Sequence, residues 1–142
     1  MHLAIAQARA AALRGEVPVG ALVVLEDRIL AAAGNRTIND CDPTAHAEIV
    51  ALREAARKAG NHRLIGASLY VTVEPCAMCA GALVQARIAR LIYGADEPKG
   101  GAVRTCMHVL DAPALNHRVE VVSGVLAEES VQLLQLFFSA RR

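Results

Sequence analysis

The sequence contains no tryptophan, and only 3% of its 142 residues are aromatic. Folds that hold single-stranded nucleic acid by stacking several bases need a row of aromatic side chains, so the composition argues against a platform of the RNA-recognition-motif or OB type. The sequence also lacks an apolar run approaching the roughly 18 residues of a membrane span. Residues 1–9 lack a basic segment followed by an apolar one, so we expect a cytoplasmic protein with no membrane partner.

The sequence also lacks a marked excess of basic or of acidic residues. Fifteen Lys and Arg stand against 14 Asp and Glu, which leaves a formal net charge of +1. This balance neither requires nor excludes nucleic acid, because a local basic face matters more than the total. Hydrophobic residues reach 54%, as expected of a folded chain, and no repeat, low-complexity tract or linker interrupts them. We therefore expect a single domain over residues 1–142.

The hydrophobic patterns predict strands that alternate with helices. Helices are expected to about Leu13, where Gly15 ends the segment, after Asp42-Pro43-Thr44 until Gly60, from Pro75 to about Ala86, and around residues 131–138. Strands are expected at residues 19–25 and 28–33, which would form a hairpin through Glu26-Asp27, and at residues 69–73, 91–93 and 119–122. Residues 95–118 are the least regular and are expected to be functional loops. This order predicts an α/β fold whose mixed sheet is covered on both faces.

Two of the four cysteines lie in the segment Val73-Glu74-Pro75-Cys76-Ala77-Met78-Cys79. Cys76 and Cys79 would lie one turn apart near the N-terminus of a helix, where the helix dipole favours the thiolate form that binds metal. The alternatives are a thioredoxin-type redox pair, although that motif follows the first strand of its fold, and a pair of buried cysteines without function. Met78 is expected to be core, and Cys106 a packed small hydrophobe.

The segment Thr44-Ala45-His46-Ala47-Glu48 would complete a metal site. His46, Cys76 and Cys79 make three ligands, which leaves the fourth tetrahedral position of a zinc ion open for water, as in catalytic sites. Zinc makes hydroxide available at neutral pH, and Glu48 would accept the proton of the water and deliver it to a substrate. The sequence therefore predicts one catalytic zinc ion per chain.

A closed structural zinc site is the main alternative to a catalytic one. Cys41 lies five residues before His46 and could supply a fourth ligand, which would make the protein a non-catalytic zinc module. Glu48 would have no role beside such a site.

His-x-Glu followed by Pro-Cys-x-x-Cys is the signature of the zinc deaminases. Over nearly its whole length the chain resembles the bacterial tRNA adenosine deaminases of the cytidine-deaminase-like superfamily. The narrower resemblance rests on five blocks: Glu16-Val17-Pro18-Val19-Gly20-Ala21, Gly34-Asn35-Arg36, Asp42–Glu48, Asn116-His117-Arg118-Val119 and Phe137-Phe138. The sequence departs from the usual pattern at His108, where the family commonly has an acidic residue, and at Ser139, where a basic residue is frequent.

The resemblance implies a three-layer α/β/α fold with a sheet of five strands, a homodimer, and hydrolysis of the wobble adenosine of a tRNA anticodon loop, that of arginine tRNA, to inosine. It implies that Asn35 hydrogen-bonds the target nucleotide; the alternative is a turn residue that closes a strand after Gly34. Candidate phosphate contacts are Lys99, Arg104, Arg118, Arg141 and Arg142, although a solvated surface charge is the simpler interpretation of any one of them. A deaminase of a free base or nucleotide, guanine or deoxycytidylate, is the alternative within the superfamily.

Overall fold

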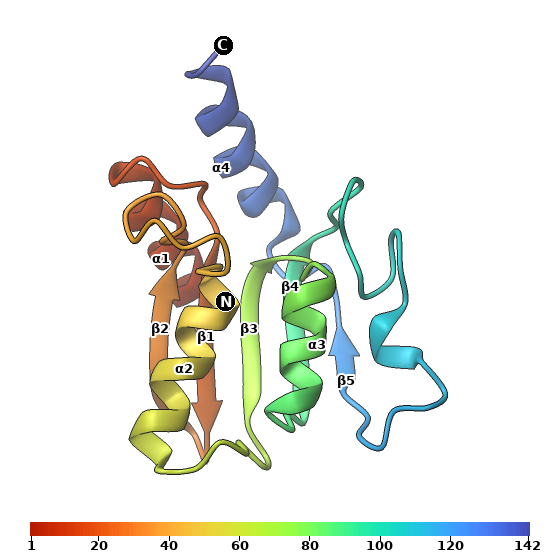
Figure 1. Ribbon diagram of the computed structural model, residues 1–142. Helices are drawn as coiled ribbons and strands as arrows, with labels where there is room; N and C mark the ends of the chain where they lie inside the picture. The colour runs from red at the N-terminus through yellow and green to blue at the C-terminus, as the bar shows by residue number, and fades with distance from the viewer.

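The computed structural model describes residues 1–142, which form a five-stranded sheet with helices on both faces (Figure 1). In chain order the elements are α1 (His2–Leu13), β1 (Gly20–Leu25), β2 (Arg28–Gly34), α2 (Ala47–Ala59), β3 (Ser68–Val73), α3 (Ala77–Gln85), β4 (Arg90–Ala95), the 3-10 turn η1 (Val109–Asp111), β5 (Glu120–Val122) and α4 (Ala127–Ser139). None of these helices has the length and apolar character that crossing a membrane requires.

The strand order β2-β1-β3-β4-β5 makes the sheet mixed. β1 pairs antiparallel with β2 and β3, whereas β3, β4 and β5 run parallel. All strands except β1 therefore point in one direction, and we call the edge where they end the carboxyl edge and the edge where they begin the amino edge. Loops beyond the carboxyl edge are where open α/β sheets place their ligands.

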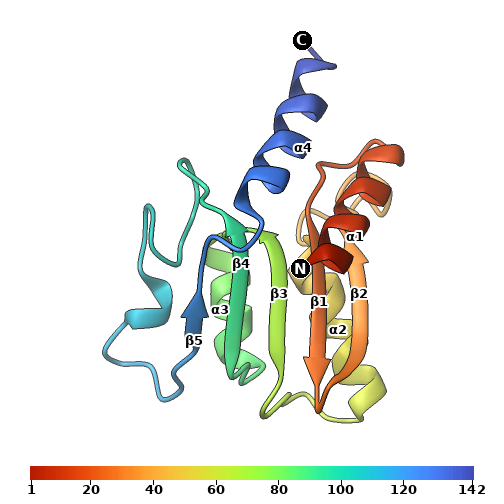
Figure 2. The same ribbon diagram turned by 180° about the vertical axis from the view of Figure 1, so that it is seen from behind.

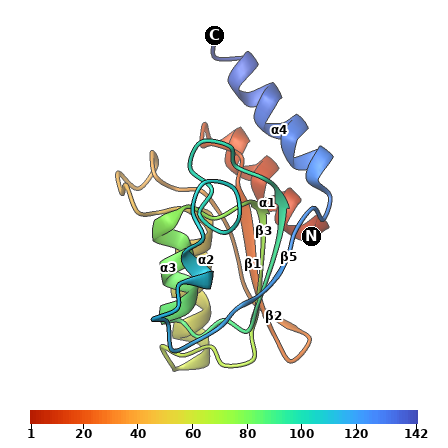
Figure 3. The same ribbon diagram turned by 90° about the vertical axis from the view of Figure 1, so that its right-hand side faces the viewer.

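Helices α2 and α3 cover one face of the sheet, and α1 covers the other (Figures 2 and 3). α4 begins on the same side as α1, beside β4, and then projects beyond the carboxyl edge of the sheet. Leu52 of α2 and Leu83 of α3 join Leu69 and Leu91 of the central strands in one buried cluster. On the other face, Gly20 lies so close to α1 that a Cβ there would meet the Ala4 backbone. The expected three-layer α/β/α fold with a mixed five-stranded sheet is confirmed.

The hairpin between β1 and β2 turns at Glu26 and Asp27, as the sequence predicts. Both residues have positive φ, 51° and 60°, the backbone of a type I′ turn. Asn-Gly adopts this turn at lower cost, so here the two flanking strands and their pairing impose it. Gly60 likewise ends α2 in the left-handed conformation, with φ 65°.

Four expectations about local structure were wrong. α2 and α3 begin at Ala47 and Ala77, so His46, Pro75 and Cys76 precede the helices. The backbones of His46 and Cys76 are extended, with ψ of 153° and 177°, which a helical residue cannot have. Met78 was expected in the core, but it is exposed because it lies on the face of α3 that turns away from the sheet. Cys106 was expected to be packed, but it is exposed in the loop after β4, where its thiol lies 3.1 Å from the Pro98 carbonyl oxygen.

Candidate metal centre and active site

Three side chains with metal-binding atoms lie together where α2 and α3 begin. His46 Nδ1 is 3.6 Å from Cys76 Sγ and 3.6 Å from Cys79 Sγ, and one ligand atom from each residue lies within 4.8 Å of the others. In a tetrahedral zinc site, bonds of about 2.3 Å to sulfur and about 2.0 Å to nitrogen place these atoms about 3.6 Å apart. The donor set and its spacing therefore fit a zinc ion.

The local backbone explains why these residues meet. His46 is the last residue before α2, Cys76 is the last residue before α3, and Cys79 lies in the first turn of α3. The unpaired N–H groups of two helix N-termini thus point toward one place, which favours negative charge there. Thiolate ligands are stabilised by this field before any metal binds.

Their mutual contact shifts the pKa values of the two cysteines in opposite directions, down for Cys76 and up for Cys79. The contact with Cys79, and then that with His46, lowers the pKa of Cys76 to about 3, and the contact with Cys76 raises the pKa of His46. Cys79 is fully buried, and the neighbouring Cys76 together with burial raises its pKa. Cys76 is therefore the ready thiolate, and a metal ion must displace the proton of Cys79.

Glu48 lies in the first turn of α2, beside the three ligands but not among them. Its side chain is only 4% exposed, and burial raises its pKa to about 7. A carboxyl group whose pKa lies near neutrality both accepts and releases a proton at the pH of the cell. The site thus pairs a metal-binding triad with a group suited to proton transfer.

His46, Cys76 and Glu48, with Cys79 buried behind them, line a cavity of about 300 Å³, at the lower end of the range for small-ligand sites. Its walls come from the carboxyl edge of the sheet and from the segment before β1. The lining residues are Val17, Val19, Asn35, Thr37, His46, Glu48, Val73, Glu74, Cys76 and Glu97.

Asn35, which follows β2, is buried in this wall with 8% exposure. Its Oδ1 accepts a hydrogen bond of 2.9 Å from the backbone N–H of Ala47, the first residue of α2. Because that bond identifies the oxygen, the amide Nδ2 is the atom left over, and no side-chain or backbone acceptor bonds it. Asn35 therefore holds the start of α2 and keeps a donor free in the wall of the cavity.

The candidate phosphate contacts fall into two groups. Lys99 is exposed in the loop after β4, near the carboxyl edge, and its side chain has no partner; Arg142 is exposed too. The others are engaged within the protein: Arg104 with Ser123, Arg118 with the carbonyl oxygens of Leu110 and Ala112, and Arg141 with the Phe137 carbonyl oxygen and ring. Cys41 does not join the metal-binding group, and its thiol lies near the Ile38 carbonyl oxygen.

Two buried carboxylates, whose role the sequence did not indicate, hold the loops around the cavity. Glu74, at the end of β3, accepts hydrogen bonds from the backbone N–H groups of residues 97, 103, 104 and 105 and from the Thr105 hydroxyl. Burial opposes ionisation, but the bonds from Thr105, Arg104 and Glu97 outweigh it and lower the pKa of Glu74 to about 2. Glu74 therefore fixes the loop that carries Glu97 and Lys99.

Glu16 does the same for the loop between β2 and α2. It is fully buried and accepts bonds from the backbone N–H groups of Ile38 and Asn39, the Asn39 amide and the Thr37 hydroxyl. Burial again opposes ionisation, and these bonds together lower the pKa of Glu16. Glu16 belongs to one of the sequence blocks that resemble the deaminases and Glu74 follows an apolar strand, but neither position indicates which groups the carboxylate binds.

The known proteins that are similar to this chain are deaminases. Residues 1–142 match the model of the MafB19-like deaminase family. The tRNA-specific adenosine deaminases of Agrobacterium fabrum and Haemophilus influenzae are each 49% identical to this chain over its full length, which spans 93% and 83% of theirs. A solved structure from a study of A-to-I editing by tRNA:A34 deaminases superimposes with a TM-score of 0.92 at 50% identity, covering 94% of this chain and 97% of that one. The chain thus belongs to the family of the tRNA-specific adenosine deaminases.

Proposed function

We propose that this protein is a zinc-dependent deaminase that hydrolyses adenosine to inosine at the wobble position of a tRNA anticodon, that of arginine tRNA. The observation that carries the chemistry is the buried Glu48 beside the triad His46, Cys76 and Cys79. The observation that carries the substrate is the family, because relatives that share half of the residues of this chain act on tRNA. Such a substrate also favours a cytoplasmic setting.

His46, Cys76 and Cys79 would hold one zinc ion per chain, which supplies an activated water. Glu48 then moves the protons: it accepts one from the water, delivers it to the ring nitrogen N1 of the adenine, and carries a second proton to the departing amine. Its raised pKa suits both directions of transfer. Asn35 would donate a hydrogen bond from its free amide Nδ2 to the target nucleotide, and Lys99 would contact a phosphate of the loop.

We also propose that residues 1–142 form one domain that pairs as a homodimer. A groove of about 420 Å³ runs between α2 and α3 on the outer side of both helices. Ile49, Leu52, Ala56, Ala82 and Ala86 supply its apolar lining, together with Arg53, His62 and Gln85. The small residues Ala82 and Ala86 would allow close approach of a second copy. Light scattering at micromolar concentration should give twice the chain mass, and a monomer would contradict the pairing.

The function is tested by measuring inosine in total tRNA with and without the protein. Inosine should be present at the wobble position of arginine tRNA only when the protein is active. Glu48→Gln is the matched variant because it keeps the size of the side chain and the three ligands. We expect it to retain bound zinc and to reduce kcat by about 100-fold or more, as loss of a proton-transfer group does. A Glu48→Gln protein with full activity would refute the role of Glu48.

A further inference from the structure

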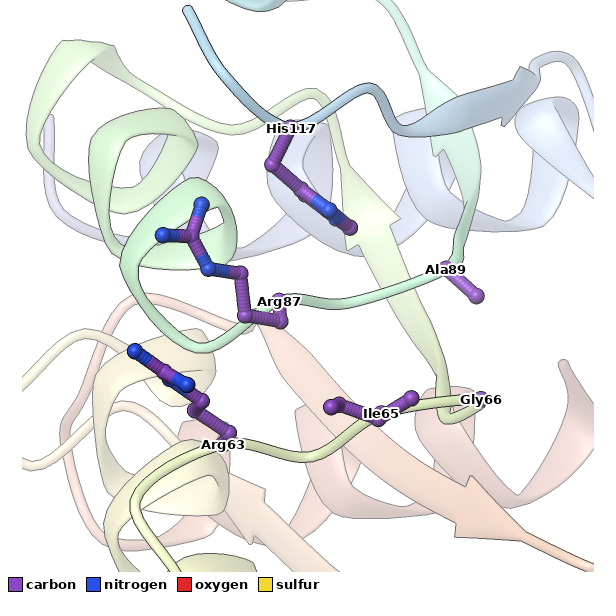
Figure 4. Close-up of a pocket in the computed structure, with 6 residues that line it drawn as sticks. All are labelled: Arg63, Ile65, Gly66, Arg87, Ala89 and His117. Carbon is purple, nitrogen blue, oxygen red and sulfur yellow. The ribbon is translucent and has the colours of Figure 1, made fainter.

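A second cavity, also of about 300 Å³, lies at the amino edge of the sheet, away from the metal centre (Figure 4). We call it the basic cavity. It is lined by Arg63, Ile65, Gly66, Arg87, Ala89 and His117. Its walls come from the loops that precede β3, β4 and β5. β3 separates it from the metal centre, and a strand of six residues spans about 17 Å.

The charge in this cavity is not balanced. Arg63 and Arg87 line it, and no carboxylate does. The Arg63 guanidinium has no hydrogen-bond or ion-pair partner, and Arg87 donates only to the neutral amide oxygen of Asn116, at 2.8 Å. Arg90 at the same edge differs, because its guanidinium pairs with the Glu120 carboxylate. Figure 4 shows the guanidinium groups of Arg63 and Arg87 on the same side of the cavity.

Hydrogen bonds hold His117 and the backbone of Arg87 in place. His117 Nε2 is 2.7 Å from the Ile88 carbonyl oxygen; a carbonyl only accepts, so Nε2 carries the proton and Nδ1 is the free ring nitrogen. Arg87 ends α3 with φ 60°, a left-handed conformation for which glycine is preferred. Its N–H still bonds the Val84 carbonyl oxygen, which fixes the strained backbone. Arg87 thus stands at a backbone position where glycine would be favoured.

We propose that the basic cavity binds a phosphate group. Two guanidinium groups without a carboxylate match the oxygens of a phosphate, which arginine contacts through paired N–H donors. Ile65, Gly66 and Ala89 are uncharged and leave the space beside the arginines open. The phosphate belongs either to an RNA backbone or to a small phosphorylated molecule. This site goes beyond deamination, because no residue of the metal centre takes part in it.

Binding is tested by titrating the ¹⁵N-labelled protein with sodium phosphate against sodium chloride at equal ionic strength. Phosphate should shift the backbone amide signals of Arg63, Ile65, Gly66, Arg87, Ala89 and His117. Arg63→Gln should weaken phosphate binding about tenfold, as loss of one charge-assisted hydrogen bond does. Arg57→Gln is the control, because Arg57 is exposed at the end of α2 and its substitution removes the same charge outside the cavity. Arg87→Gln is the second variant.

The binding of two RNAs, full-length tRNA and the anticodon stem-loop, shows whether the phosphate belongs to an RNA backbone or to a small molecule. If the ligand is an RNA backbone, Arg63→Gln should weaken binding of full-length tRNA or of the anticodon stem-loop, and the slope of log K against log salt should fall by about 0.7 to 0.9. If the ligand is a small phosphorylated molecule, Arg63→Gln should weaken the binding of inorganic phosphate and leave the affinity for both RNAs unchanged. Inorganic phosphate that binds Arg63→Gln and Arg87→Gln as well as it binds Arg57→Gln would overturn the proposal, whatever the deaminase assays show.

Discussion

No side chain can be added at Gly101 without meeting the Glu74 carboxylate. A Cβ there would touch Oε2 and the carboxyl carbon of Glu74, as well as the Glu97 carbonyl oxygen. The close approach exists because four backbone N–H groups between residues 97 and 105 converge on Glu74. Gly101 therefore lets the loop after β4 wrap around one carboxylate at the rim of the metal centre.

Gly101→Ala should destabilise the protein by about 1 to 3 kcal/mol, because the loop or the carboxylate must move in a closely packed region. It should also raise KM, since Glu97 and Lys99 lie in the displaced loop. Gly100→Ala is the matched control: a Cβ at Gly100 meets nothing within 4 Å, so its effect should stay within about 0.5 kcal/mol. Chemical denaturation of both variants measures the difference, and equal stabilities would show that Glu74 does not constrain the loop.

Cys79→Ser should abolish zinc binding, whereas Cys41→Ser should not change it. Cys79 is a member of the triad, and Cys41 lies outside it. Because a metal that binds only the folded state stabilises it, Cys79→Ser should also lower Tm, and a chelator should lower the Tm of the parent protein. Metal analysis after gel filtration gives the zinc content per chain. Loss of zinc from Cys41→Ser would instead support the alternative of a structural zinc site with Cys41 as the fourth ligand.

Glu16→Gln should destabilise the protein in a pH-dependent way. The folded-state pKa of Glu16 lies below its ordinary value of 4.5, because its hydrogen bonds from Asn39, Thr37 and Ile38 outweigh burial. A lowered pKa means that the carboxylate contributes its stability fully above pH 4.5 and loses it as the pH falls through the folded-state value. The difference in unfolding free energy between parent and Glu16→Gln should therefore be constant near neutrality and shrink below about pH 4. A difference that stays constant down to pH 3 would contradict this.

The sequence was sufficient to predict the order of elements and the grouping of His46, Cys76 and Cys79, because hydrophobic periodicity and ligand spacing are local signals. It was insufficient for Glu16 and Glu74, whose partners lie 21 to 31 residues away in loops without a pattern. It also misplaced Met78 and Cys106, because apolar character does not show which side of a short helix or loop faces the core. The basic cavity was missed for the same reason: Arg63, Arg87 and His117 are brought together only by the parallel strands β3, β4 and β5.

The relative turnover of an RNA stem-loop and of small substrates separates a tRNA deaminase from deaminases of free bases and nucleotides. The metal centre itself serves either kind of substrate, so the difference must lie in the binding energy of the flanking nucleotides. An unpaired anticodon base can be splayed into the cavity at little cost, and its neighbours then hold it in place. We expect kcat/KM for an arginine-tRNA anticodon stem-loop to exceed that for free adenosine, guanine and deoxycytidylate by about 100-fold or more, and to fall as salt rises. A stem-loop with guanosine at the wobble position is the control for base selection. Faster turnover of free guanine or deoxycytidylate would make the tRNA assignment wrong and leave the role of Glu48 intact.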